Sequence, residues 1–243
     1  MGKILFFSGA GISKPSGIQT FRDSDGAMWN NFNINQVCNI NTWSKHRKIV
    51  YEFYNNRRRE LQDVDPNVAH NLIARLQKQF GTSKVINITQ NVDDLFERAG
   101  AKKTLHVHGT LLETICRKCG HIEHIGYSDM QYDNTCKSCG SVYIKPNVVF
   151  FHEKAPMYEE MDKIIASLTK DDMVVIIGTS GEVIPYGRMV NQTAPTKNII
   201  NVLDDPTGYL ENQGYILFSE VHLKDAEQFM KEKYNEFEKF LKG

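Results

Sequence analysis

Residues 4–22 read Ile-Leu-Phe-Phe-Ser-Gly-Ala-Gly-Ile-Ser-Lys-Pro-Ser-Gly-Ile-Gln-Thr-Phe-Arg and place a short apolar run directly before a glycine-rich turn. The run Ile4–Phe7 is typical of a buried parallel strand. In the turn Gly9-Ala10-Gly11 the glycines carry no Cβ atom, so the backbone bends sharply and a bulky anion can approach it. A helix beginning at Ile12 would point its free N–H groups at that anion. The stretch therefore predicts a nucleotide-phosphate site at the end of a strand.

The turn departs from the common dinucleotide-binding fingerprint, which has a third glycine where this chain has Lys14. A Gly-Ala-Gly sequence by itself also occurs in plain tight turns. Phe21 and Arg22 extend the stretch by an aromatic ring and a guanidinium, which favours a ligand site.

The composition excludes several classes of protein. Lys and Arg together number 29, as do Asp and Glu, so a chain of 243 residues has no net charge and no global basic field to attract nucleic acid. No apolar run approaches the ~20 residues of a membrane span. We expect a monomeric cytoplasmic protein that binds neither nucleic acid nor membranes.

Polar side chains follow a second apolar strand. The strand Val85–Thr89 leads into Gln90, Asn91 and Asp93. Ligands of open α/β sheets bind at the carboxyl ends of the strands, where two amides and a carboxylate can hydrogen-bond a ribose and a carboxamide. The alternative is that Asn91 and Asp93 only cap the following helix.

Two further strands end in polar residues. Met173–Ile177 is the clearest buried strand, and Gly178-Thr179-Ser180 follows it with hydroxyls suited to phosphate and ribose. Asn198–Val202 is another strand and contains Asn201.

A histidine pair lies in the run Leu105–Gly109. Alternate residues of a strand point the same way, so His106 and His108 are expected on one face. An isolated histidine is more often a hydrogen-bonded core residue than a catalyst, and this alternative applies to both.

Residues 44–61 are expected to form a helix with Val50, Phe53 and Leu61 on one face and the solvated run Arg57–Arg59 on the other. Tyr54 and Arg57 are three residues apart and share a helix face. Taken alone, they would be a tyrosine packed under an arginine on a wet surface.

Four cysteines form a C-x2-C-x16-C-x2-C array. This spacing is typical of a zinc ribbon in which four thiolates hold one metal and leave no position open for water or substrate. The zinc is then structural. Disulfide pairs are the alternative. The predicted ligands are Cys116, Cys119, Cys136 and Cys139.

These motifs together resemble the sirtuins, the NAD-dependent protein lysine deacylases. The resemblance runs from about Leu5 to Asn201 and includes Thr-Gln-Asn-Val-Asp-Asp-Leu at 89–95, His108-Gly109 and the cysteine array. The segment Phe53–Arg59 resembles the substrate-pocket helix of the desuccinylase-type (class III) members of bacteria and mitochondria.

The resemblance implies a role for each site residue. His108 is the general base, and Tyr54 and Arg57 bind the carboxylate of a succinyl-lysine. The implied NAD-binding residues are Gly9, Ala10, Gly11, Phe21, Arg22, Gln90, Asn91, Asp93, Gly178, Thr179, Ser180 and Asn201. The peptide would contact Val148, Phe150 and Val183.

The implied fold is a doubly wound, Rossmann-like α/β sheet with a small inserted lobe of helices and a four-cysteine zinc ribbon. Residues 1–243 would form one catalytic domain, with a helical insert at 31–63 and a zinc-ribbon insert at 113–144. NAD and one structural zinc ion would be bound, and acyl-lysine proteins would be the substrates, yielding nicotinamide and O-acyl-ADP-ribose.

One residue departs from the family pattern. The strand at 145–153 resembles the sirtuin strand that pairs with the substrate peptide, but His152 replaces its glycine. Two alternative functions stay open on this fold: an NAD glycohydrolase or mono-ADP-ribosyltransferase, and a non-catalytic NAD-binding module.

Overall fold

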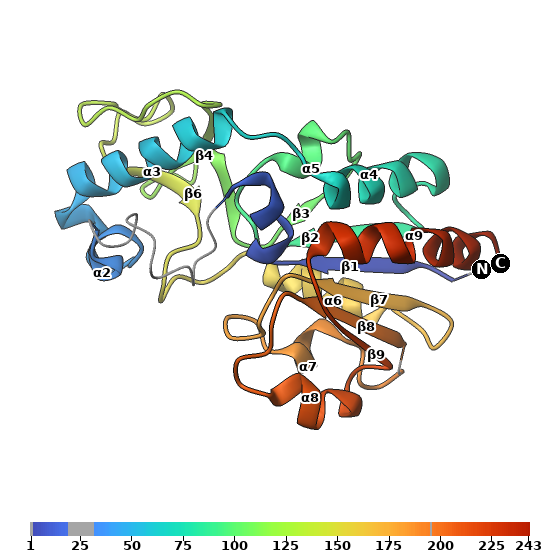
Figure 1. Ribbon diagram of the computed structural model, residues 1–243. Helices are drawn as coiled ribbons and strands as arrows, with labels where there is room; N and C mark the ends of the chain where they lie inside the picture. Colours follow the sequence, from blue (N-terminus) through green and yellow to red (C-terminus); the bar gives the residue numbers. More distant parts are fainter. Residues whose placement is uncertain (1, 19–31, 195) are drawn as a thin grey trace.

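The computed structural model describes residues 2–18, 32–194 and 196–243. At its centre is a six-stranded parallel sheet in the order β3-β2-β1-β7-β8-β9 (Figure 1). The chain winds outward from β1 in one direction and from β7 in the other, which confirms the predicted doubly wound fold. The strands are β1 (Ile4–Ser8), β2 (Val85–Thr89), β3 (Leu105–His106), β7 (Met173–Ile177), β8 (Lys197–Val202) and β9 (Glu220–Leu223).

The sheet is buried on both faces, which explains the continuous apolar runs of its central strands. Ile4 and Phe6 point into one core, with helices α4 (Val68–Phe80) and α9 (Ala226–Lys242). Leu5 and Phe7 point into the opposite core. The helices of that second face, below the sheet in Figure 1, are α6 (Tyr158–Ala166), α7 (Tyr186–Met189) and α8 (Tyr209–Gln213).

A small lobe lies beside the sheet and has a core of its own (Figure 1). We define the small lobe as helices α2 and α3 together with the antiparallel sheet β5-β4-β6. The core packs α3 against this sheet and includes two of the four clustered cysteines. The bounds are α2 (Ile34–Val37), α3 (Arg47–Gln62), β4 (Gly109–Cys116), β5 (Ile122–His124) and β6 (Ile144–Val148).

Two sequence-based expectations about helices are corrected. No α-helix begins at Ile12; instead two 3₁₀ turns follow β1, η1 (Ala10–Ile12) and η2 (Lys14–Ser16). Pro15 explains this, because its ring would clash with the Gly11 carbonyl and it has no N–H for the helical hydrogen bond.

The second correction concerns the basic run on α3, which is not solvated throughout. Arg58 is fully buried. Its Nε donates to the Leu111 carbonyl at 2.6 Å and its Nη1 to the Asn55 side chain at 2.9 Å. Arg58 lies one helical turn after Tyr54, so it shares the face that packs on the small-lobe sheet.

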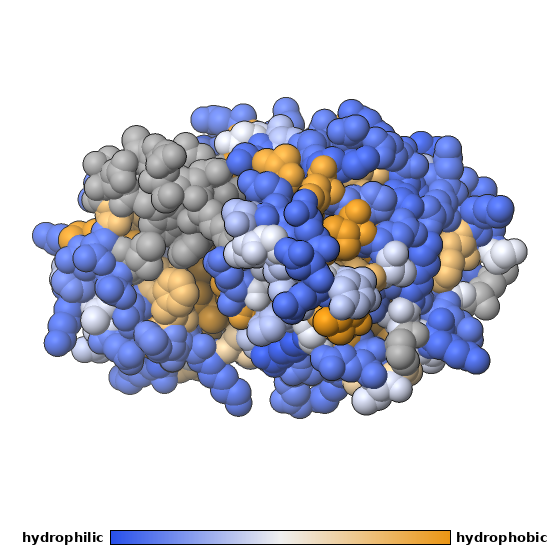
Figure 2. All heavy atoms as spheres, turned by 60° about the horizontal axis from the view of Figure 1, so that its bottom comes forward, coloured by the Kyte–Doolittle hydropathy of each residue, from blue (hydrophilic) through white to orange (hydrophobic). Residues whose placement is uncertain are grey.

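Short helical elements connect these layers. The remaining helical turns are η3 (Trp43–Lys45), α5 (Leu95–Arg98) and η4 (Gly214–Ile216). Figure 2 shows a mostly hydrophilic face on which apolar residues form small, separate groups. Among the residues that the structure describes, none of the helices has the length and apolar character needed to cross a membrane.

Candidate active site

The predicted phosphate turns lie together where the strand order reverses, between the carboxyl ends of β1 and β7. Gly9 N donates to the Ile177 carbonyl at 2.9 Å, and Gly11 N to the Gly178 carbonyl at 2.8 Å. A Cβ atom on Gly11 would lie 2.7 Å from Gly178 Cα, and one on Gly178 would lie 2.4 Å from Ile12 N. The two turns therefore pack backbone against backbone at the carboxyl ends of the strands, which is where open α/β sheets bind nucleotides.

The polar residues after β2 lie beside these turns. Gln90 Nε2 donates to Thr179 Oγ1 at 2.9 Å. Asn91 Nδ2 donates to Ser13 Oγ at 2.9 Å, and Ser13 Oγ donates to Asp93 Oδ2 at the same distance. Burial raises the pKa of Asp93, and its bonds to Ser13 and the Leu95 amide oppose that effect.

The helix-capping alternative for Asp93 is not met in the strict sense, because Asp94 is the N-cap residue of α5; the second oxygen of Asp93 instead accepts from Leu95 N, at the first residue of α5, at 3.2 Å. One carboxylate thus contacts the start of α5 and anchors Ser13. The sequence analysis missed Ser13, which connects the glycine turn with Asn91 and Asp93. A hydroxyl two residues after the glycine turn is the signal that would have indicated it.

His108 lies beyond the end of β3 and bridges two elements. Its Nδ1 is 3.1 Å from the Gln90 carbonyl, and its Nε2 is 2.8 Å from the Tyr158 hydroxyl. A carbonyl only accepts, so Nδ1 carries the proton and Nε2 is the acceptor. Burial lowers the pKa of His108, which keeps the imidazole neutral and basic near pH 7. The sequence analysis also missed Tyr158.

His106 has a different environment, because β3 ends at this residue and the strand alternation does not reach His108. Its Nδ1 lies 2.8 Å from the Asn91 carbonyl and its Nε2 lies 3.2 Å from Glu97 Oε1. Burial is the largest single influence and opposes charging, but the hydrogen bond and charge of Glu97, the Asn91 carbonyl and the charge of Asp93 together outweigh it and raise the pKa of His106. The two imidazoles therefore hold two consecutive carbonyls, those of Gln90 and Asn91.

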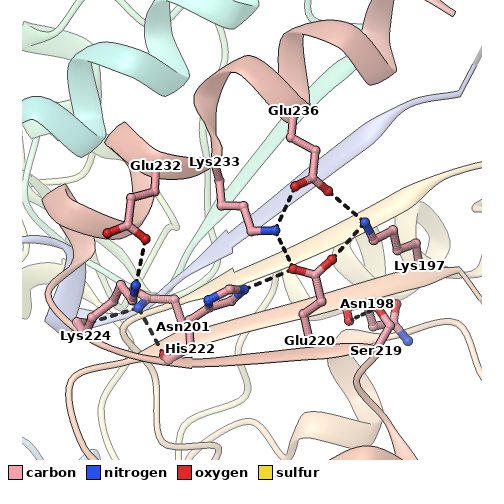
Figure 3. A network of polar contacts seen from close by, with 10 residues as sticks. All are labelled: Lys197, Asn198, Asn201, Ser219, Glu220, His222, Lys224, Glu232, Lys233 and Glu236. Atoms are coloured by element: carbon pink, nitrogen blue, oxygen red, sulfur yellow. Dashed lines mark hydrogen bonds and ion pairs between the residues drawn. The ribbon is translucent and has the colours of Figure 1, made fainter.

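Asn201 lies in the interior at the far end of the site. Its Nδ2 donates to the carbonyls of His222 at 3.2 Å and Lys224 at 2.9 Å. A small cavity of about 30 Å³ adjoins Asn201, Gly11 and Gly178. Figure 3 shows the ion-pair network of β8, β9 and α9 beside it, in which Lys197, Glu220, Lys233 and Glu236 alternate in charge.

The four predicted metal ligands converge. Their sulfur atoms all lie within 4.8 Å of one another. Cys116 and Cys139 are 3.7 Å apart, as are Cys119 and Cys136. A tetrahedral zinc ion with Zn–S bonds of about 2.3 Å places its sulfurs about 3.8 Å apart. The array therefore fits a structural zinc ion, and none of the four is in a disulfide.

The predicted substrate residues are only partly brought together. Tyr54, Val148 and Phe150 share the small-lobe core, and the Tyr54 ring stacks on Phe150 with centroids 5.6 Å apart. The Arg57 guanidinium lies over the Phe53 ring, 5.7 Å from its centroid. The remaining predicted residues are elsewhere: Val183 is exposed after β7, Ser180 lies in the turn after β7, and Phe21 and Arg22 lie outside the described residues.

The segment after β6 makes a turn at the position of the sequence departure. Glu153 N donates to the Phe150 carbonyl at 3.0 Å, and His152 has φ of 65°. A glycine would adopt this left-handed conformation without strain. Glu153 also pairs with the buried Lys145 at 3.1 Å and with Arg117, inside the first cysteine pair, at 2.9 Å.

Comparison with known proteins gives one consistent result. A model of the Sir2 family matches residues 9–185. The chain is 37% identical to an NAD-dependent protein deacylase of Helicobacter hepaticus over 99% of both chains. It is 42% identical to one of Campylobacter jejuni over 84% of both. A solved Sir2 homologue–NAD complex superposes with a TM-score of 0.82 and 27% identity, covering 98% of this chain and 90% of that one. On this similarity and the site geometry, the chain belongs to the Sir2 family, the sirtuins.

Proposed function

We propose that the protein is an NAD-dependent protein lysine deacylase. The observation that carries the proposal is the neutral His108, whose carbonyl partner Gln90 also hydrogen-bonds Thr179 beside the glycine turns. A basic imidazole therefore lies close to the surface that suits a dinucleotide. The relatives named as NAD-dependent protein deacylases support the same reaction.

In this proposal NAD supplies the ribose carbon that takes the acyl oxygen as nicotinamide leaves. When NAD is bound, the glycine turns would hold the pyrophosphate, Asn91 and Asp93 would hold the nicotinamide end, and Gln90 would orient the ribose. His108 Nε2 takes the proton of a ribose hydroxyl, which makes that oxygen a nucleophile toward the acyl carbon. The lysine amine would then leave the acyl carbon and one water molecule would add to it, so that the products are nicotinamide, O-acyl-ADP-ribose and free lysine.

The test compares acetyl, succinyl and glutaryl peptides with NAD, together with a control that lacks peptide. Nicotinamide and O-acyl-ADP-ribose should appear in equal amounts and only with an acyl peptide. Replacement His108→Ala should lower turnover by ~100-fold or more, the usual effect of losing a general base. Nicotinamide release without peptide would instead indicate a glycohydrolase. NAD binding without turnover on any peptide would indicate a binding module.

We also propose a preference for acidic acyl groups, read by Tyr54 and Arg57. The Nε atom of Arg57 is buried and has no hydrogen-bond partner among the described residues, so the guanidinium retains a donor for a carboxylate. Besides its contact with the Phe53 ring, the guanidinium makes an ion pair with the exposed Glu60, which a substrate can replace.

The double variant Tyr54→Phe, Arg57→Met should lower kcat/KM for succinyl peptides by ~10-fold or more, because a hydrogen bond to a charge contributes roughly 1.5–3 kcal/mol. Acetyl peptides should change much less. The matched control is Arg59→Met, since Arg59 is exposed on the same helix and pairs with Asp129. Equal losses on both peptides would refute the selectivity.

We further propose that the protein acts as a monomer in the cytoplasm and does not bind nucleic acid. The balanced charge of the chain and the dispersed apolar groups of the face in Figure 2 support this. Light scattering tests the monomeric state, cell fractionation tests the location, and an electrophoretic mobility shift with duplex DNA tests nucleic-acid binding.

A further inference from the structure

Tyr158 occupies the nitrogen that the proposed mechanism uses. It is the first residue of α6, and its hydroxyl lies 2.8 Å from His108 Nε2. The two rings are 5.8 Å apart at 45°, so the contact is a hydrogen bond in which the rings do not stack. Burial raises the pKa of the Tyr158 phenol, which is therefore neutral and able to donate.

The tautomer of His108 leaves Nε2 able to accept only one hydrogen bond at a time. Because Nδ1–H donates to the Gln90 carbonyl, Nε2 has the single lone pair of the neutral ring. One lone pair accepts one strong hydrogen bond. A ribose hydroxyl can reach Nε2 only after the Tyr158 hydroxyl has moved away.

The Tyr158 ring is held from its other side. The Arg188 guanidinium lies over it, 4.7 Å from the ring centroid. Asp162, one turn further along α6, accepts two hydrogen bonds from Arg188 at 2.9 and 2.7 Å. The ring is thus placed by α6 and by a cation that is itself fixed.

We propose that Tyr158 is a positioning residue that orients His108 and covers Nε2 until a ribose hydroxyl displaces it. The inference rests on the proposed function. In this inference the Tyr158 hydroxyl competes for Nε2 with two other groups, the ribose hydroxyl and a free proton. Both partners need the same lone pair, so the tyrosine weakens both by the same factor.

The competition predicts a matched pair of changes in Tyr158→Phe, which keeps the ring under Arg188. The alkaline plateau of kcat/KM for NAD should rise about fivefold, the effect of removing one ordinary hydrogen bond. The pKa of the acid limb, which reports the free enzyme, should rise by the logarithm of the same factor, about 0.7. At acid pH, below both pKa values, the unaltered protein and Tyr158→Phe should then have the same kcat/KM for NAD.

Other charged groups near this site are unchanged by the variant. Arg188 and Asp162 neutralise each other on the tyrosine side. His106 faces Glu97, with Asp93 near, and contributes equally to both profiles. Tyr215→Phe is the matched control, because Tyr215 is 77% exposed, and it should leave the profile unchanged.

Three results would overturn the inference. A lower plateau in Tyr158→Phe would make the tyrosine a proton relay, an unchanged profile would make the contact incidental, and unequal shifts would exclude a shared lone pair. The NMR titration of the His108 ring in the free protein measures the pKa shift without turnover. It therefore tests the contact even if the deacylase proposal fails, whereas peptide deacylation by the unaltered protein tests that proposal alone.

Discussion

His152 is the residue at which the sequence analysis expects this chain to depart from the sirtuin pattern. Among the non-glycine residues that the structure describes, it alone has a positive φ. An L-residue in this region costs about 1 kcal/mol, because its Cβ approaches the following carbonyl. The turn at 150–153 persists because Glu153 is fixed by Lys145 and Arg117.

His152→Gly is expected to stabilise the protein by about 0.5–1 kcal/mol, because glycine adopts this φ without strain. Urea unfolding measures the difference. His152→Ala is the matched control, since alanine carries the same Cβ and should give no comparable gain. If both variants were equally stabilised, the imidazole and not the backbone would be the cause.

His70 predicts a loss of stability in acid. It is fully buried between Ser13 and Phe96, and burial lowers its pKa from 6.5 to about 4. The folded state therefore favours the neutral ring: stability is complete above pH 6.5 and falls as the pH drops toward 4. Between about pH 7.5 and pH 5 this histidine alone should account for about 2 kcal/mol.

Urea unfolding at the two pH values measures this effect. His70→Gln should lose stability overall but lack this share of the pH dependence. An identical pH slope in the variant would assign the acid sensitivity to other groups.

For single residues, the sequence indicated the chemistry of a site better than it indicated which side chains are in contact. The cysteine cluster could be predicted from its spacing alone, whereas His108 and Asn91 were singled out by the resemblance of His108-Gly109 and residues 89–95 to sirtuin motifs. Ser13 and Tyr158 could not be predicted, because each acts through a neighbour 80 or 50 positions away in the chain. The burial of Arg58 was likewise invisible, since its partner carbonyl belongs to Leu111 on another element.

Among the elements, the strands were predicted best. Val85–Thr89 and Met173–Ile177 were predicted with the observed bounds. Met173–Ile177 is buried on both faces and is therefore a continuous apolar run, whereas Val85–Thr89 also contains the buried polar residues Asn87 and Thr89. The helix expected at Ile12 was wrong, since Pro15 overrides the general strand–turn–helix pattern. Where one residue type forbids a conformation, as proline does here, that residue therefore determines which secondary structure forms.

Helix α4 is expected to depend on Asn67 at its start. The Asn67 side chain accepts from Ala69 N at 2.9 Å and donates to the Ile12 carbonyl at 2.7 Å. Asn67→Ala should cost about 1–2 kcal/mol in urea unfolding, the usual effect of losing an N-cap. It should also raise KM for NAD, because the turn after β1 loses its support.

Asn67→Ser separates the two effects, because serine caps a helix but is too short to reach the turn. It should recover most of the stability while KM stays raised. Recovery of both would show that α4 alone supports the cofactor turn.

The molecule as a whole has three cores, one on each face of the large sheet and one in the small lobe. Only the small-lobe core contains cysteines of the metal cluster. Zinc removal by a chelator, or Cys119→Ser, should therefore melt the small lobe first and give a second, lower thermal transition by calorimetry.

Calorimetry of the zinc-free protein should be paired with binding measurements. ADP-ribose, which would lie on the large sheet, should retain most of its affinity, whereas acyl-peptide affinity should fall by ~10-fold or more as the small lobe loses its order. A single transition, with both affinities lost together, would mean that the cores unfold as one unit.

The contact between Gly11 and Gly178 limits which substitutions this sequence can accept. The two backbones are in direct contact there, and glycine is already the smallest residue. No substitution at one position can therefore make room for a side chain at the other. A saturation library should show paired intolerance at two places 167 positions apart, with no rescuing second change. No second substitution can therefore compensate for a change at Gly11 or Gly178, and sequence variation should accumulate only at positions around this contact.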